Sequence, residues 1–252
     1  MPSQKFASGR FFLKDTVRKQ IDFSQTAQSL GGAAPPLQKG CPTDLRRIVL
    51  PDGKKALRRL ARMPVGEAIP RRESIRRYRP NPLTLEELSA LLWAVQGVRA
   101  KLSDDTALRS VPSAGARHAF ETYLAVCFVE NLSAGLYRYL PFDGSLAELT
   151  IDPHIGGRAA GACFGQEFIA EAAATFFWTA IPARMEWRYD LAAHKVIAID
   201  AGHVGQNLYL VSEALGIGCC AVAAYDQQAC DALLGVDGEE EFVVYLAAVG
   251  KQ

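Results

Sequence analysis

Two arginines and a serine alternate within residues 72–78, whose sequence is Arg-Glu-Ser-Ile-Arg-Arg-Tyr. Ser74 lies between Arg72 and Arg76, so a hydroxyl group stands between two guanidinium groups. Arginine offers a fork of charged donors that matches a phosphate, and a serine hydroxyl adds one more donor. The spacing therefore predicts a site for a phosphate group.

The same residues belong to a longer basic stretch, residues 54–79. It contains ten Lys or Arg against two Glu, a net charge of +8, whereas the whole chain of 252 residues carries a formal charge of +1. Three interpretations stay open: a solvated charged face, a site for a small phosphorylated ligand, and a nucleic-acid surface. The last is disfavoured because no aromatic residues interleave and no recognition motif is present. The balanced total charge also gives no reason to expect a polyanionic partner.

The spacing of cysteines and histidines gives no sign of a metal site. The six cysteines include no Cys-x-x-Cys pair, and the four histidines do not cluster at ligand spacing. We interpret the cysteines as reduced thiols, mostly in the core, including the adjacent Cys219 and Cys220, because a vicinal disulfide is geometrically awkward.

The hydropathy pattern predicts a cytoplasmic protein with no membrane partner. Charged residues are scattered through residues 1–30, so this segment lacks the apolar core of a signal peptide. The longest mainly apolar run, residues 172–183, contains a proline and is shorter than the roughly 20 residues that a membrane-spanning helix needs.

Local patterns predict both helices and strands. Capping residues and C-terminal glycines predict three helices, with N-caps at Thr84, Asp200 and Asp226 and ends at Gly97, Gly216 and Gly235. Alternation and β-branched content predict strands at 120–129, 174–181, 219–224 and 242–249, and a hairpin of 135–140 with 146–149. We therefore predict an α+β fold with three layers, α/β/α, around a central mixed, mostly antiparallel sheet. Residues 1–65 would form a lead segment packed on the main domain, residues 66–252.

Three motifs occur in the order that is typical of the nitroreductase family. Residues 72–78 resemble the Arg-x-Ser-x-Arg/Lys signature of the family's opening helix, and residues 111–116, Val-Pro-Ser-Ala-Gly-Ala, resemble its Pro-Ser loop. The stretch 200–250, beginning Asp-Ala-Gly-His-Val-Gly-Gln-Asn-Leu, resembles the family's C-terminal half, in particular the branch related to the dehydrogenases that oxidise azoline rings in ribosomal peptides. The resemblance extends over residues 69–251 and implies a nitroreductase-like fold in an intertwined homodimer.

The resemblance also implies FMN as the cofactor. The residues that would bind it are Arg72, Glu73, Ser74 and Arg76 near the phosphate and ribityl chain, Pro112, Ser113, Ala114 and Gly115 from the partner subunit, Ala223 and Ala224 along the isoalloxazine, and Lys251 in place of the family's C-terminal phosphate clamp. No Gly-x-Gly-x-x-Gly motif follows a strand, so NADH or NADPH would bind only transiently as the donor. Ala116 stands where dinucleotide-reducing members commonly have Asn, which leaves the substrate class open.

The implied activity is hydride transfer, through N5 of the flavin, between a nicotinamide or other donor and a small organic acceptor. The family's azoline dehydrogenases use a Lys-Tyr pair ahead of the long C-terminal helix, and Tyr189 and Lys195 lie in that region here. Together with His118 they are the candidate catalytic residues. Two alternatives stay open: a dehydrogenase of azoline-type rings in a modified peptide, and a non-catalytic flavin-binding subunit of a modifying complex.

Overall fold

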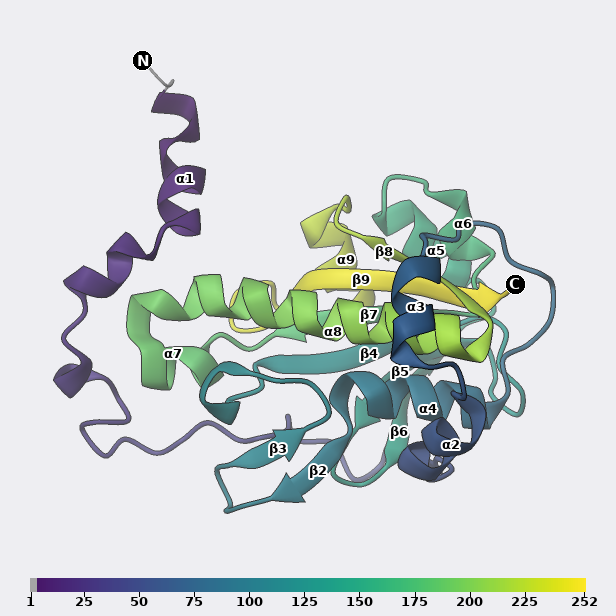
Figure 1. Cartoon of the computed structure of the whole chain (residues 1–252), viewed down its shortest axis with the longest axis horizontal. Coiled ribbons are helices and arrows are strands. Elements are labelled where there is room, and N and C mark those ends of the chain that lie inside the picture. The colour runs from purple at the N-terminus through teal and green to yellow at the C-terminus, as the bar shows by residue number, and fades with distance from the viewer. Residues whose placement is uncertain (1–3) are drawn as a thin grey trace.

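The strands that the sequence predicts are rich in aromatic and aliphatic residues, which favour a pleated, buried surface. In the computed structural model, which describes residues 4–252, the six predicted strands and one further strand, which was not predicted, form one seven-stranded sheet (Figure 1). In sheet order the strands are β1 (Arg47–Val49), β6 (Ser145–Ile151), β5 (Gly135–Leu140), β4 (Phe120–Val126), β7 (Ala174–Ala180), β9 (Phe242–Lys251) and β8 (Ile217–Val222). Every neighbouring pair is antiparallel, so the prediction of an α+β fold with a mostly antiparallel sheet is confirmed. The sheet is entirely antiparallel, however, and not mixed as predicted.

Helices cover both faces of this sheet, because successive residues of its strands point to opposite sides. Phe176 and Trp178 of β7 belong to one core, whereas Phe177 between them belongs to the other. The first layer contains α2 (Gly53–Leu60), α4 (Leu85–Gln96) and α8 (Ala193–Leu215), and the other contains α5 (Ile155–Ala162), α6 (Glu167–Ala170) and α9 (Gln227–Leu234). The predicted α/β/α layering is therefore confirmed.

Short elements complete the framework. Helix α3 (Val65–Arg71) packs against α8, α7 (Ala183–Tyr189) leads into α8, and β2 (Val98–Lys101) pairs with β3 (Ala107–Arg109) in a separate hairpin. Near the N-terminus, α1 (Ala7–Leu13) projects away from the sheet, as Figure 1 shows in purple.

Buried charged groups attach the lead segment to the body of the protein. The Arg109 guanidinium donates to the Leu37 carbonyl at 2.7 Å, and the buried Glu121 carboxylate accepts from Lys39 N–H, also at 2.7 Å. A buried guanidinium or carboxylate without a partner is costly, so these backbone groups stabilise the buried charges. Part of the predicted lead segment 1–65, including β1, is thus built into the sheet.

Two of the three predicted helix starts are confirmed and one is wrong. Thr84 and Glu87 form the capping box of α4, and Asp226 caps α9. Asp200 caps no helix, because the turn after α7 continues directly into α8, which begins at Ala193. Asp200 is buried inside α8, where its carboxylate has a tertiary role described below.

The cysteines fit their interpretation as core thiols. All six are free, and four of them are buried: Cys163, Cys219, Cys220 and Cys230. Across residues 4–252, no helix is long and apolar enough to cross a membrane. Within the same residues, no group of three or more His, Cys, Asp or Glu side chains is placed to hold a metal ion.

Candidate functional site

Residues 72–79 form an extended segment along the edge of the sheet. The resemblance predicted the signature inside a helix, and the structure corrects this placement, because α3 ends one residue before it. The Ile75 N–H donates to the Cys219 carbonyl of β8 at 3.0 Å, and the Arg79 N–H donates to the Lys251 carbonyl of β9 at 2.9 Å. Hydrogen bonds to two strands therefore replace those of a helix in this segment.

Two glycines let the segment lie close to the strands. A Cβ atom on Gly218 of β8 would stand 2.7 Å from the Ile75 side chain, and one on Gly250 of β9 would stand 2.7 Å from the Tyr78 ring. Such contacts are shorter than van der Waals packing permits. The side chains of Ile75 and Tyr78 thus pack directly on the backbone of the two glycines. Ser74, by contrast, is exposed to solvent.

Tyr209 of α8 is the centre of the contacts made by the signature. Its hydroxyl oxygen lies 2.8 Å from Ser74 Oγ and accepts a hydrogen bond of 2.9 Å from Ala221 N–H in β8. The Arg72 guanidinium lies over its ring, 5.2 Å from the centroid, in a cation–π contact. Sequence reasoning missed Tyr209, because no local pattern links it to Ser74, which is 135 positions away.

The two signature arginines keep their charges available. Among the described residues neither Arg72 nor Arg76 pairs with a carboxylate, and Arg76 lies over the Phe168 ring, 5.9 Å from its centroid. Lys251, the predicted phosphate clamp, instead forms an ion pair with Glu87 of α4 at 2.5 Å. An anion at this edge of the sheet would therefore meet two free guanidinium groups, whereas the charge of Lys251 is already balanced.

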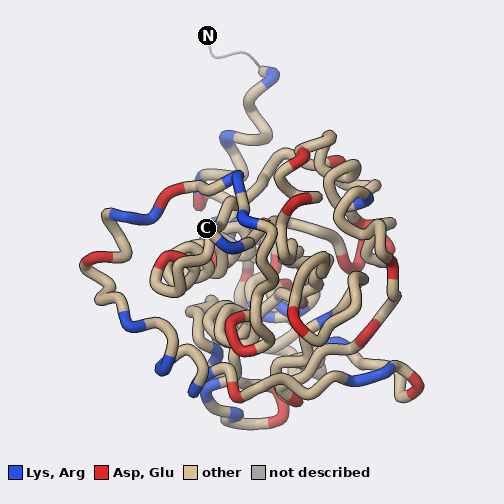
Figure 2. Tube along the Cα trace, turned by 90° about the vertical axis from the view of Figure 1, so that its right-hand side faces the viewer, with Lys and Arg blue, Asp and Glu red and all other residues tan. Residues whose placement is uncertain are grey.

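Much of the remaining basic stretch is paired or dispersed. Three of its members have acidic partners, in the pairs Lys55 with Asp52, Arg59 with Glu86 and Arg71 with Glu213. Figure 2 shows Asp and Glu residues interspersed with Lys and Arg along the chain. This arrangement favours a solvated face for most of the stretch, whereas Arg72 and Arg76 each lie over an aromatic ring.

The chain after β8 offers a surface of small side chains. Ala223 and Ala224 are both exposed, and the Ala224 carbonyl accepts a hydrogen bond from the Gln166 side chain at 2.8 Å. Burial raises the pKa of Cys219 in β8 to about 12, and burial also raises that of Cys220, so both thiols stay protonated at neutral pH. The candidate site thus combines the guanidinium groups of Arg72 and Arg76 with an exposed strand end, and neither Cys219 nor Cys220 supplies a thiolate.

The loop of residues 112–115 is fixed by the first half of α8. Ser113 Oγ accepts a hydrogen bond from His118 N–H at 2.9 Å, and the Asp200 carboxylate accepts one from Ala114 N–H at 3.3 Å. Burial raises the pKa of Asp200, although hydrogen bonds from the loop oppose this effect. Gly115 has a φ of +57°, and a Cβ atom there would stand 2.7 Å from the Tyr189 hydroxyl, so the loop requires glycine.

Within one chain, the loop and the signature do not meet. The loop contacts α8 at Asp200 and the signature contacts it at Tyr209, nine residues further along the helix. At 1.5 Å per residue these positions are about 13 Å apart along the axis. The predicted cofactor-binding residues thus form two separate clusters, one at each half of α8.

The three candidate catalytic residues have different surroundings. Tyr189 is half-buried beside Gly115. Lys195 is also half-buried, and its charge acts on Asp15, whose pKa is lowered chiefly by a hydrogen bond from Arg18. His118 is buried, and its ring nitrogen Nε2 lies 3.1 Å from a backbone carbonyl. Only Tyr189 combines contact with the loop and partial exposure.

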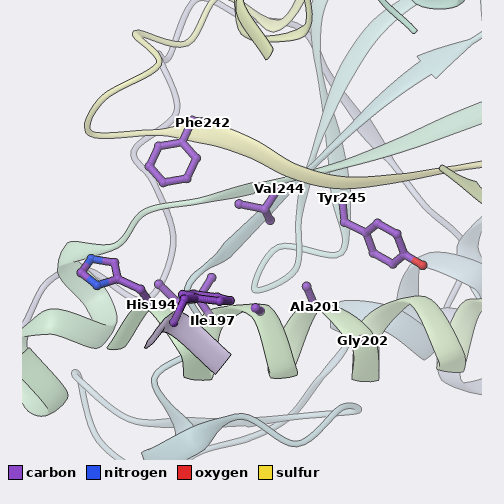
Figure 3. Close-up of a pocket in the computed structure, with 9 residues that line it drawn as sticks. His194, Ile197, Ala201, Gly202, Phe242, Val244 and Tyr245 are labelled. Atoms are coloured by element: carbon purple, nitrogen blue, oxygen red, sulfur yellow. The ribbon is translucent and has the colours of Figure 1, made fainter. Parts of the chain in front are cut away.

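An apolar pocket of about 410 Å³ opens between α8 and β9 (Figure 3). Its lining consists mainly of apolar side chains from these two elements, together with Phe12 from α1 and His194. Apolar side chains of α8 and β9 therefore line an open pocket here, with Phe12 of α1 at its side. Ile199 of α8, which does not line the pocket, is 49% exposed.

The fold and the signature agree with a known class of proteins. The sequence model of the Nitroreductase family matches residues 69–251, so this chain belongs to the nitroreductase family and is an oxidoreductase. Within residues 69–251 lie all the predicted site residues, from Arg72 to Lys251.

Similar proteins support this assignment. The nitroreductase-like protein MJ1384 of Methanocaldococcus jannaschii is 31% identical over 209 residues, which are 83% of this chain and 98% of that protein. A nitroreductase-like protein of Ralstonia eutropha JMP134 has a crystal structure with a TM-score of 0.67 and 25% identity, over 87% of this chain and 98% of that one. A chain of the Escherichia coli microcin synthetase McbBCD complex, solved with truncated pro-MccB17 bound, shares the fold with a TM-score of 0.60 and 15% identity, over 98% of this chain and 86% of that one.

The environment of His118 predicts a pH dependence of stability. Burial lowers its pKa from 6.5 to about 3, and the nearby charge of Arg109 adds to the effect. Between these pH values the unfolded chain binds one more proton than the folded one, so stability present above pH 6.5 is lost as the pH falls. The unfolding free energy, measured in urea, should fall between pH 7 and pH 5 in the wild type. In His118→Gln we expect this fall to be smaller by roughly 1–2 kcal/mol.

The matched control is His154→Gln, because His154 is exposed. This variant should lose as much stability on acidification as the wild type. Equal losses in the wild type and in His118→Gln would show that His118 is not held neutral by burial.

Proposed function

We propose that this chain is an FMN-dependent oxidoreductase that transfers hydride between a nicotinamide or other donor and a small organic acceptor. The observation that carries the proposal is the pair of unpaired guanidinium groups, Arg72 and Arg76, on either side of the exposed Ser74 hydroxyl. Two cations and a neutral donor suit the dianionic phosphate of FMN. Membership of the nitroreductase family supports the same class of activity.

In this proposal each part of FMN would meet a different group of residues along the sheet edge. Arg72, Ser74 and Arg76 would hold the phosphate, and the exposed Glu73 carboxylate could accept hydrogen bonds from the ribityl hydroxyl groups. Beyond them the exposed alanines at 223 and 224 leave room for a planar ring. When bound, FMN would supply hydride transfer at N5, and the protein would contribute binding and orientation.

A homodimer would bring the two clusters of site residues together. In one chain the loop 112–115 lies about 13 Å along α8 from the signature contact, so it cannot line the same chain's phosphate site. A second copy packed on the apolar side of α8 would bury the pocket that Figure 3 shows and present its own loop across the interface. Tyr189, beside that loop, is then the best placed of the candidate catalytic residues, ahead of Lys195 and His118.

A second candidate is a dehydrogenase of azoline-type rings in a modified peptide. It is favoured by the fold shared with a chain of the microcin synthetase complex over 98% of this chain. Tyr189 at the end of α7 and Lys195 in the first turn of α8 would then be the proton-transferring pair. Two assays distinguish the candidates. The azoline dehydrogenase would lower the mass of an azoline-containing peptide by two hydrogens, whereas the first candidate would turn over a small acceptor with NADH or NADPH.

Arg72→Ala tests the phosphate site directly. A charge-assisted hydrogen bond contributes about 1.5–3 kcal/mol, so its loss should weaken FMN binding by about ten- to a hundredfold. Arg77→Ala is the matched control, because Arg77 belongs to the same basic run and is exposed. It should change the FMN dissociation constant less than about threefold, as is usual for exposed charges.

Both constants would be measured by flavin fluorescence at one salt concentration. Equal losses in the two variants would mean that a diffuse basic surface attracts FMN, and that residues 72–76 form no defined phosphate site.

The composite site predicts that the protein is dimeric whenever it holds FMN. Light scattering of the purified protein should report about twice the chain mass of 27.4 kDa. A monomer that retains FMN on dilution would refute the contribution of residues 112–115 from the partner.

A further inference from the structure

Tyr209 connects three parts of the candidate site through one side chain. Its hydroxyl contacts both Ser74 Oγ, at 2.8 Å, and Ala221 N–H, at 2.9 Å, while its ring lies under the Arg72 guanidinium. The side chain is half-buried, at the seam between α8, β8 and the signature segment. Of the described residues outside 72–78, only Tyr209 contacts two members of the signature through hydrogen bonds or cation–π contacts, namely Ser74 and Arg72.

The direction of these hydrogen bonds follows from their donors. Ala221 N–H can only donate, so the Tyr209 oxygen accepts there. The Tyr209 proton then has one acceptor within hydrogen-bond distance, Ser74 Oγ. If Ser74 accepts this proton, its own proton is free to point outward.

An anion selects this arrangement. Phosphate oxygens only accept hydrogen bonds, so a serine that donated to Tyr209 would present lone pairs to the anion and repel it. With Tyr209 as the donor, the hydroxyl proton of Ser74 can join the guanidinium groups of Arg72 and Arg76 as a third donor.

We propose that Tyr209 is a positioning residue for the phosphate site: its hydroxyl orients Ser74 as a donor, and its ring holds the Arg72 guanidinium beside it. This inference rests on the proposed binding of FMN and adds a residue to it. Through Ala221 the same hydroxyl also ties the signature to β8, which continues to the exposed strand end at 223–224.

Two flavins separate positioning at the phosphate from a general structural role. FMN and riboflavin differ only in the phosphate, so a residue that acts on the phosphate donors should affect the binding of FMN alone. Tyr209→Phe keeps the ring under Arg72 and removes only the hydroxyl. We expect it to weaken FMN binding about three- to tenfold, as for one neutral hydrogen bond, and to leave riboflavin binding unchanged within twofold.

A double-mutant cycle with Ser74→Ala tests the route of the effect. If Tyr209 acts through Ser74, then adding Tyr209→Phe to Ser74→Ala should weaken FMN binding by less than a further twofold. Tyr137→Phe is the matched control, because it removes a tyrosine hydrogen bond of 2.8 Å on β5, away from the site. It should leave the affinity for both flavins unchanged.

Each outcome decides something. The positioning role would be overturned if Tyr209→Phe lost equal affinity for FMN and riboflavin, or if its FMN affinity were unchanged. In either case, FMN binding by the wild type would still uphold the proposed function. Additive effects of Tyr209→Phe and Ser74→Ala would overturn the action through Ser74. Failure of the wild type to bind FMN would overturn the proposed function and this inference together.

Discussion

The close contact between residues 72–79 and the edge of the sheet is the constraint on which the site depends. Ile75 and Arg79 donate backbone hydrogen bonds to β8 and β9, and glycines 218 and 250 leave the space that the contact requires. A segment held in this way cannot rotate or slide, so Arg72, Ser74 and Arg76 keep fixed places relative to β8. A flexible basic loop with the same composition would carry the same charge but would not hold its hydrogen-bond donors at defined positions.

Helix α8 relates this edge to the rest of the molecule. Near its middle the buried Asp200 binds the backbone of the loop at Ala114, and nearer its end Tyr209 binds the signature. A straight helix keeps the two contacts at a fixed separation, and the apolar pocket opens along the first part of the helix, where residues 194–202 contribute to its lining. Burial raises the pKa of Asp200, and the hydrogen bonds from the loop at Ser113 and Ala114 oppose this effect.

Local signals predicted the elements that local interactions determine. Helices α4 and α9 begin at residues whose own side chains cap them, and the hairpin of β5 with β6 forms around the predicted turn. The prediction for Asp200 failed because its partner, Ala114 N–H, comes from a distant loop and replaces the expected cap. The helical placement of the signature failed for the same reason, since β8 and β9 supply its hydrogen bonds.

The site was predictable as a set of residue types but not as an arrangement. A sequence shows that His118 lies beside the loop, but not that burial keeps it neutral, and it shows Tyr209 only as one more residue of an amphipathic helix. Likewise, the ion pair of Lys251 with Glu87 joins the C-terminal strand β9 to helix α4, which lies far from it in the sequence. Such contacts depend on how the helices and strands pack together, and the spacing of residues in the sequence does not predict this packing.

The most direct test of the account is a crystal structure of the protein with FMN bound. The account predicts that the phosphate lies within hydrogen-bond distance of Arg72, Ser74 and Arg76, that the ring lies along residues 223–224, and that residues 112–115 of a second copy contact it. A phosphate bound elsewhere on the basic surface, with the ring away from the end of β8, would contradict it.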